Sequence, residues 1–254
     1  MSEALEMFDL SSIGIELDEP TEPSKRTDML IYGRHRVGKT TFCAQAAEVE
    51  GMYPVLWVAA EDGTGAFAGK YPKGRIQVAK VSTWDQIQSL VEWFLDEEHP
   101  FKTIVIDTLG QVQEIIKRDY LMSNSGKGDF AMWDKVNMGL VWLLDSIHNS
   151  PYNGFYIAHT DKVKDDTLGT VLLSPYFLGK KSSTDIPKIP DTIAYLAKPG
   201  EEDEDGKQIR VLQLTSTERV EAGSRYEHKL PSQMVNPKLK DYFELITAAE
   251  AESE

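Results

Sequence analysis

The sequence predicts an α/β fold in which helices cover both faces of a mostly parallel sheet. Over residues 27–158, short apolar segments alternate with longer segments whose apolar residues recur at helical spacing. One of the short segments, Thr-Ile-Val-Ile at residues 103–106, is rich in β-branched residues and predicts a buried strand. Strands that alternate with helices indicate a parallel sheet. The pattern changes after residue 190, where a C-terminal antiparallel extension is expected.

The elements can be placed in chain order from these patterns. The predicted strands are residues 29–32, 55–60, 103–106 and 154–158, with a possible further strand at 75–81. The predicted helices are residues 41–50, 83–97, 109–120 and 133–149. Within 83–97, the side chains of Ile87, Leu90, Val91 and Phe94 fall on one helical face, which is typical of a helix packed on a core.

The last third of the chain has a different composition. Residues 160–190 are polar and contain two glycines and three prolines, so we expect a long functional or mobile loop there. Residues 192–197 and 208–215 predict an antiparallel pair, and residues 239–249 a short amphipathic helix. The predicted organisation is a flexible acidic arm at 1–26, a core domain at 27–235, and a helix with an acidic tail at 236–254.

The net charge of −14 is concentrated in three short segments. Residues 1–24 carry seven acids and no Lys or Arg, residues 201–205 are five consecutive acids, and three more acids end the chain. Without these 15 charges the body is near +1, so the acidity does not exclude nucleic acid as a partner. The single cysteine, Cys43, and the lack of a long apolar segment favour a cytoplasmic protein without a membrane anchor.

A phosphate-binding motif follows the first predicted strand. Residues 33–40, Gly-Arg-His-Arg-Val-Gly-Lys-Thr, match the P-loop pattern and lie between a strand and a helix, as this motif requires. The main-chain amides and the helix N-terminus bind phosphate, Lys39 is expected at the β- and γ-phosphates, and Thr40 at Mg²⁺. ATP and Mg²⁺ are therefore the expected cofactors. The predicted nucleotide-binding residues are Gly33, Arg34, His35, Arg36, Val37, Gly38, Lys39, Thr40 and Thr41.

Three polar residues follow later predicted strands. Asp107 ends the strand at 103–106 and is expected to bind Mg²⁺ with Thr40, although it could instead cap the helix that begins near Leu109. Glu61 follows the second strand and is the candidate base that orients water, with Asp62 beside it as the alternative. His159 follows the strand at 154–158 and is a candidate sensor of the γ-phosphate.

The motifs in this order resemble the RecA-like ATPase core. The segments YGRHRVGKTTF, WVAAEDGTG, TIVIDTLG and YIAHTDK are similar to those of small phage-encoded RecA-like P-loop proteins, some of which act in single-strand annealing or recombination. The resemblance covers about residues 27–220 and implies that Glu61 activates water. It also implies a nucleotide sensor, usually glutamine, at the position of His159.

The resemblance further implies two mobile loops that hold single-stranded DNA, at about residues 122–132 and 160–190. Both segments contain groups suited to phosphate contact and base stacking. The candidate DNA-binding residues are Lys127, Phe130, Lys162, Lys164, Tyr176, Phe177, Lys180 and Lys181. Four acids, Asp161, Asp165, Asp166 and Asp185, nearly cancel the charge of the second loop, so a merely solvated loop is the alternative.

RecA-like sites are commonly completed by a cation from a neighbouring subunit. Arg219 and Arg225 follow the strand at 208–215 and are the candidates for this role, in a ring or filament of identical subunits.

The expected function is that of an ATPase acting on single-stranded DNA in recombination or annealing, with a single-strand-binding protein as a further partner. Two alternatives stay open. One is a nucleotide kinase, against which stands the lack of an arginine-rich lid. The other is a nucleotide-gated assembly module with little hydrolysis.

Overall fold

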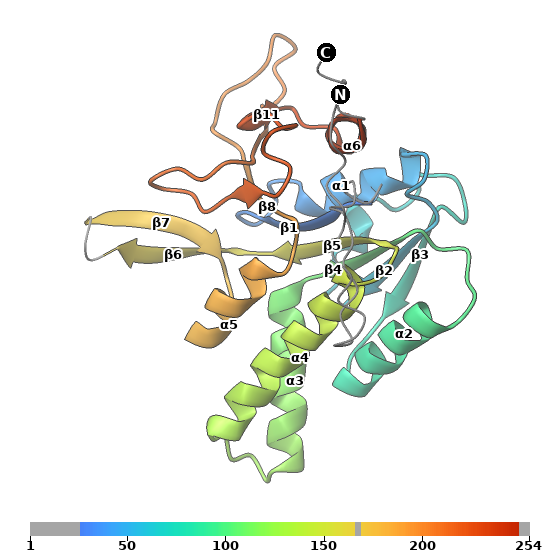
Figure 1. Cartoon of the computed structure of the whole chain (residues 1–254), viewed down its shortest axis with the longest axis vertical. Coiled ribbons are helices and arrows are strands. Elements are labelled where there is room, and N and C mark those ends of the chain that lie inside the picture. Colours follow the sequence, from blue (N-terminus) through green and yellow to red (C-terminus); the bar gives the residue numbers. More distant parts are fainter. Residues whose placement is uncertain (1–25, 166–168, 249–254) are drawn as a thin grey trace, which may run out of the picture.

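The computed structural model of the chain describes residues 26–165 and 169–248, and places a nine-stranded sheet at the centre of the fold (Figure 1). The order across the sheet is β11-β9-β8-β1-β5-β4-β2-β3, with β10 paired to β8. The strands are β1 Asp28–Tyr32, β2 Val55–Ala59, β3 Ile76–Lys80, β4 Thr103–Asp107, β5 Asn153–Ala158, β8 Thr192–Ala197, β9 Val211–Gln213, β10 Gly223–Ser224 and β11 Gln233–Val235. From β8 to β3 the neighbouring strands are parallel, whereas β9, β10 and β11 pair antiparallel. The predicted fold class is confirmed.

Helices cover both faces of this sheet (Figure 1). Successive side chains of the central strands enter two separate cores, because strand residues alternate between faces. One core is closed by α1 Lys39–Ala44, the 3-10 helix Gln45–Glu48 and α6 Leu239–Thr247. The other is closed by α2 Trp84–Asp96, α3 Leu109–Ser123 and α4 Phe130–His148. Among the described residues, no helix is both long enough and apolar enough to cross a membrane.

The register of the parallel strands brings the predicted functional residues to one edge of the sheet. Tyr32 at the end of β1 pairs with Ala158 of β5, and Asp107 pairs with both Ala59 of β2 and Ile157 of β5. The segments that follow these strands therefore begin at the same edge. In an open parallel sheet, the carboxyl ends of the strands are where ligands bind.

The expectation of a long loop at 160–190 needs correction. The described part of this segment contains the hairpin β6 Thr160–Asp165 and β7 Thr170–Pro175, the helix α5 Lys180–Asp185 and the 3-10 helix Ile186–Lys188 (Figure 1). Six residue pairs join the two strands of the hairpin. Polarity was a poor guide here, because a two-stranded ribbon that leaves the main sheet needs few apolar residues.

Two smaller differences concern other predicted elements. The helix expected at 41–50 is a short α-helix followed by a 3-10 turn. The first predicted DNA loop is also shorter than expected, since α3 extends to Ser123 and α4 begins at Phe130, which leaves residues 124–129 as the connection. Most of the acidic arm at 1–26 and the last residues of the acidic tail lie outside the described residues.

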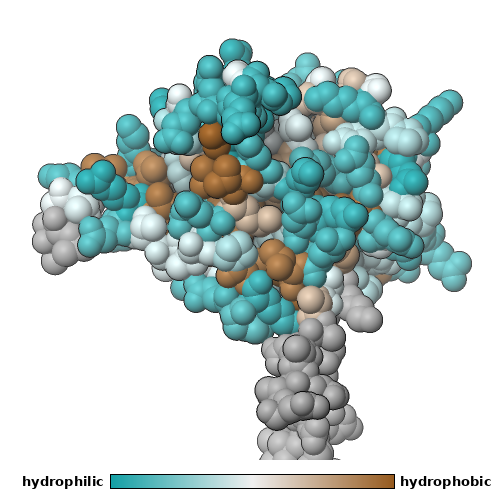
Figure 2. Space-filling model, turned by 90° about the horizontal axis from the view of Figure 1, so that it is seen from above, coloured by the Kyte–Doolittle hydropathy of each residue, from teal (hydrophilic) through white to brown (hydrophobic). Residues whose placement is uncertain are grey.

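The surface seen from above in Figure 2 is mostly hydrophilic, with small separate hydrophobic patches between polar side chains. The exposed fractions of the described side chains agree with this view. Few large apolar side chains among them are strongly exposed, and the most exposed are Met122 at 77% and Phe130 at 90%. Apolar side chains that are exposed singly are normal on a monomer surface.

Candidate functional site

The P-loop connects β1 to α1 at the edge of the sheet described above. Gly33 is required at its start, since a Cβ there would lie 2.3 Å from the carbonyl oxygen of Leu196. Gly38 has φ of +112°, a conformation that side chains disfavour. Lys39 is only 6% exposed, and its Nζ donates to the carbonyl oxygens of Gly33 (2.7 Å) and Arg34 (3.0 Å). The ammonium group is thus held inside the loop whose amides are suited to phosphate.

The geometry of a divalent-cation site is present between α1 and β4. The Oγ1 of Thr40 donates to the Oδ2 of Asp107 at 3.2 Å. The Oδ1 of Asp107 is buried and has no hydrogen-bond partner, an arrangement that a cation ligand explains. Asp107 is not needed as a helix cap, because Thr108 accepts from the amide of Gln111 and caps α3. A hydroxyl and a carboxylate are ligands suited to Mg²⁺, so these two residues fit that ion.

Burial and neighbouring charges shift the two ionisable groups at this site. Burial, together with the negative charge of Glu61, raises the pKa of Asp107 to about 6. Burial lowers the pKa of Lys39 to about 8, against the opposing effect of Asp107 and Glu61. Desolvation disfavours the charged form in both cases. Asp107 is mostly charged above about pH 6, and Lys39 is mostly charged below about pH 8. The two residues are therefore charged at the same time between these values.

A cavity of about 490 Å³ collects the residues predicted to act on nucleotide. Its lining contains the P-loop residues His35, Arg36, Gly38, Lys39, Thr40 and Thr41 together with Glu61, Asp62, Asp107, Thr108 and His159. The Oγ1 of Thr108 donates to the Oε2 of Glu61 at 3.4 Å, which ties Glu61 to the start of α3. Asp62 also lines the cavity, so the geometry keeps both acids near the site.

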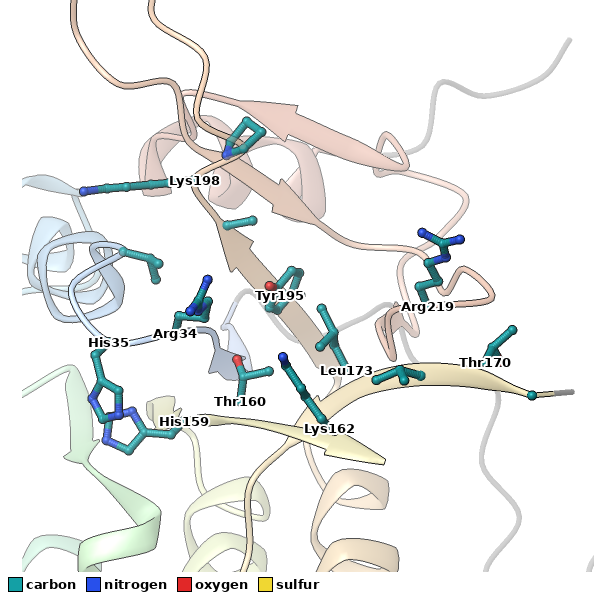
Figure 3. A pocket seen from close by; sticks show the side chains of 15 residues that line it. Arg34, His35, His159, Thr160, Lys162, Thr170, Leu173, Tyr195, Lys198 and Arg219 are labelled. Atoms are coloured by element: carbon teal, nitrogen blue, oxygen red, sulfur yellow. The ribbon is translucent and has the colours of Figure 1, made fainter. Parts of the chain in front are cut away.

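His159 lies against the P-loop in a contact that the sequence did not reveal. Its ring packs on that of His35 with centroids 4.2 Å apart, and Figure 3 shows the two rings overlapping. Burial, together with the positive charges of Lys39 and His35, lowers the pKa of His159 to about 4. His159 is therefore a neutral imidazole at neutral pH. A neutral ring can exchange hydrogen bonds with phosphate but adds no charge.

A second cavity, of about 1110 Å³, opens on the other side of this histidine pair (Figure 3). Four of its lining residues, Arg34, Lys162, Lys198 and Arg219, are Lys or Arg, and no Asp or Glu of the described part of the chain lines it. We call this cavity the basic groove. Its wall is fixed by the hairpin, because the amide of Leu173 in β7 donates to the carbonyl oxygen of Arg219 at 2.8 Å.

The pleat of the hairpin explains how a nearly neutral segment presents a basic face. Lys162 pairs with Leu173, and both line the basic groove. Asp161 pairs with Ser174, and neither lines it. Successive residues of a strand point to opposite faces. Lys162 and Asp161 therefore lie on opposite faces of the hairpin.

The predicted DNA-binding residues fall on separate surfaces. Lys162 lines the basic groove, and Lys164 lies two residues further along the same strand. Lys180 and Lys181 begin α5, where Lys181 pairs with Asp134 of α4 at 3.6 Å. Lys127 and Phe130 lie at the far tip of α3 and α4, apart from the hairpin (Figure 1).

One of the predicted stacking residues must be corrected. Phe177 is 5% exposed and belongs to the core beneath α4, so its ring cannot receive a base. The neighbouring Tyr176 is 38% exposed. The two neighbouring aromatic side chains thus differ in exposure, and the sequence did not indicate which of them is buried.

The two candidate trans arginines differ in their surroundings. Arg225 forms an ion pair with Asp191 at 3.0 Å within the same chain. Arg219 is exposed, lines the basic groove, and forms no ion pair with another described residue. Arg219 is thus the more available of the two.

Sequence reasoning missed two cations of this region. Lys198 follows β8 and lines the basic groove, and Arg210 precedes β9 and lines the nucleotide cavity. Neither stands in a recognisable motif. Only their position at the ends of strands near the P-loop edge could have indicated them.

Most of the chain matches one protein family. The family model described as AAA domain matches residues 25–226. The chain belongs to the AAA domain family. The P-loop, the Thr40–Asp107 contact and the parallel sheet agree with this assignment, because P-loop ATPases bind nucleotide and Mg²⁺.

Solved structures similar to this AAA domain protein are distant in sequence. A KaiC-like protein from the archaeon Pyrococcus horikoshii is 15% identical, with 75% of this chain and 78% of that chain covered and a TM-score of 0.43. The RadB recombinase is 16% identical, with coverages of 74% and 79% and a TM-score of 0.45. An ATPase from the type III secretion system of pathogenic bacteria is 14% identical, with coverages of 68% and 51% and a TM-score of 0.46. No curated protein sequence matches the chain.

Proposed function

We propose that this protein hydrolyses ATP with Mg²⁺ and acts on single-stranded DNA in recombination or strand annealing, as phage-encoded RecA-like proteins do. The observation that carries the proposal is the basic groove, which is lined by Arg34, His35 and Val37 of the P-loop and shares His35 and His159 with the nucleotide cavity. A groove that four cations and, among the described residues, no acids line suits the phosphate backbone of a nucleic acid.

The residues of the nucleotide cavity have complementary roles in this proposal. The P-loop amides and Lys39 bind the β- and γ-phosphates, while Thr40 and Asp107 hold Mg²⁺, which neutralises phosphate charge when bound. Glu61 orients the attacking water and accepts its proton. Asp62 is the alternative base. His159 accepts or donates a hydrogen bond at the γ-phosphate.

The same histidine supports a connection between the two cavities. His159 packs on His35 of the P-loop and directly precedes β6, the strand that carries Lys162. Its carbonyl oxygen also accepts from the amide of Tyr176 at 2.8 Å, so both ends of the hairpin meet at this residue. A shift of His159 on nucleotide binding would move the basic wall of the groove. We propose that this contact couples ATP to DNA.

The wider setting follows from the same proposal. The protein would work in the cytoplasm as a ring or filament of identical subunits, with Arg219, or less readily Arg225, reaching the nucleotide of a neighbour. A single-strand-binding protein is the proposed further partner. In this proposal the groove binds DNA with Lys162, while Lys164, further along the same strand, and Lys127, Phe130, Tyr176, Lys180 and Lys181 would make peripheral contacts.

The test is ATP turnover measured alone, with single-stranded DNA and with nucleoside monophosphates. We expect DNA to stimulate turnover and monophosphates to have no effect. Stimulation by a monophosphate with formation of its diphosphate would instead show a nucleotide kinase, and the absence of any turnover would favour a gated assembly module. Lys39→Ala is the control, since it should abolish turnover and weaken ATP binding by about 100-fold while leaving the circular dichroism unchanged.

A further inference from the structure

An arginine from outside the P-loop motif lies across the P-loop. The Nε of Arg210 donates to the carbonyl oxygen of Val37 at 3.0 Å. A Cβ on Gly38 would lie 2.9 Å from the same Nε, so the arginine packs directly on the glycine that precedes Lys39. The glycine is thus needed for this contact as well as for its backbone conformation.

The backbone of Arg210 is fixed by a pair of hydrogen bonds. Its amide donates to the Oδ1 of Asn236 at 3.0 Å, and the amide of Asn236 donates to the carbonyl oxygen of Arg210 at 2.7 Å. The following residues continue this contact as the β9–β11 ladder, in which Val211 pairs with Val235. The origin of the side chain is therefore held in place beside the P-loop.

Among residues 26–165 and 169–248, no carboxylate forms an ion pair with the guanidinium group of Arg210. Asp203 lines one cavity together with Arg210 but forms no ion pair with it. The bond from Nε to a neutral carbonyl group leaves the two terminal amino groups of the guanidinium available. A guanidinium group that faces a phosphate-binding loop can bind two phosphate oxygens at once.

The position of Arg210 indicates which phosphates it can reach. It lines both the 490 Å³ cavity, with Lys39, Thr40 and Asp107, and a third cavity of about 270 Å³, with Gln45, Asp203 and Gln208; Gly38 and Thr41 line both as well. A triphosphate whose terminal end lies near Asp107 would pass Gly38 if its nucleoside lay in the third cavity. Arg210 stands at that passage.

We propose that Arg210 binds the α- and β-phosphates of the nucleotide in the same subunit. The inference rests on the proposed ATP binding and adds a residue to it. Arg210 differs from the candidate trans arginines because its contact with the P-loop lies within one chain. The side chain also keeps the Val37–Gly38 peptide in place, so it both positions the loop and contacts the ligand.

The experiment measures the dissociation constants of ATP, ADP, adenosine and inorganic tripolyphosphate for four proteins: wild type, Arg210→Ala, Arg210→Lys and the control Arg118→Ala. Arg118 is a surface arginine on α3, away from the P-loop. Arg210→Ala should weaken ATP, ADP and tripolyphosphate by about tenfold each and leave adenosine unchanged. Arg210→Lys should recover part of the loss, and Arg118→Ala should bind as wild type.

Three results would overturn the inference: wild-type ATP affinity in Arg210→Ala, a loss confined to ATP, which would place the contact at the γ-phosphate, or a loss that includes adenosine. If Arg210→Ala does not fold, Arg210→Lys and Arg210→Gln carry the same comparison. If wild type itself binds no ATP, the proposed function fails. If wild type binds ATP and Arg210→Ala binds it equally well, only the role of Arg210 fails.

Discussion

At the scale of single residues, the nucleotide site depends on three side chains whose charges affect one another. The negative charge of Glu61 helps to raise the pKa of Asp107, while Lys39 is buried near both carboxylates. The raised pKa of Asp107 and the lowered pKa of Lys39 have the same first cause, which is loss of water. Binding of a cation and of phosphate compensates for that loss.

The pH dependence of ATP binding follows from these two shifts. Below about pH 6 Asp107 is protonated and cannot bind Mg²⁺, and above about pH 8 Lys39 is neutral and loses its attraction for phosphate. We expect the affinity of the free protein for ATP with Mg²⁺ to be greatest between these values. It should fall by up to about tenfold per pH unit on either side. Titrations by fluorescence of a labelled nucleotide would measure it.

Glu61→Gln supplies the control for the acid side. Removing the charge of Glu61 removes one cause of the raised Asp107 pKa, so the loss of affinity should move to lower pH. The titration of ATP itself is common to both proteins and cancels in the comparison. An acid limb at the same pH in both proteins would contradict the assignment to Asp107.

Glu61→Gln also tests the choice of base. We expect turnover to fall by about 100-fold or more, because the water loses its proton acceptor, while the affinity for ATP at neutral pH stays within about twofold. Asp62→Asn is the matched variant and should keep most of its activity. The opposite result, with Asp62→Asn inactive and Glu61→Gln active, would make Asp62 the base.

At the scale of elements, Thr108 connects helix α3 to the site. Its hydroxyl accepts from the amide of Gln111 and donates to Glu61, so one side chain begins the helix and orients the candidate base. Thr83 caps α2 in the same way, by accepting from the amide of Gln86, and has no contact with the nucleotide cavity. The two threonines form a natural pair for comparison.

Thr108→Ala and Thr83→Ala should each lower the free energy of unfolding by about 1 kcal/mol, because each removes an N-cap. Only Thr108→Ala should also lower turnover, by roughly fivefold, since one hydrogen bond of about 1 kcal/mol holds Glu61. Chemical denaturation and steady-state kinetics would measure both effects. Equal turnover in the two variants would show that Thr108 acts only as a cap.

The hairpin permits a second comparison, between its two faces. Lys162→Gln should weaken binding of single-stranded DNA and lower the slope of log affinity against log salt concentration by about 0.7, because one phosphate contact is lost. Asp161→Asn, on the opposite face, should leave both quantities unchanged. Fluorescence anisotropy with a labelled oligonucleotide at several salt concentrations gives the slope. An equal effect from both variants would exclude the groove as the binding surface.

At the scale of the whole molecule, Arg219 lines the groove and is also the residue that we propose serves a neighbouring subunit. A mixture of Lys39→Ala and Arg219→Ala subunits separates these roles in the absence of DNA. Each variant alone should be inactive, whereas mixed assemblies pair an intact P-loop with an intact Arg219. We expect turnover of the mixture to exceed that of either variant. Turnover equal to the mean of the two would confine Arg219 to its own chain.

The parallel sheet, the P-loop and the order of the polar residues that follow the strands could all be predicted from the sequence. These features are local, since a strand with buried side chains or a glycine-rich turn is specified by a few adjacent residues. Asp107 could be assigned to strand β4 in this way, but its freedom to bind a cation required the position of Thr108 as the helix cap.

The contacts between residues that are distant in sequence became visible only in the folded chain. The basic groove joins four segments of the chain, and Arg210 reaches Val37 across 173 positions of sequence. In the hairpin at 160–175, positive and negative charges nearly cancel in composition. The pairing of the two strands is what assigns Lys162 and Asp161 to opposite faces. Contacts of this kind depend on register and strand order, which no short segment of sequence encodes.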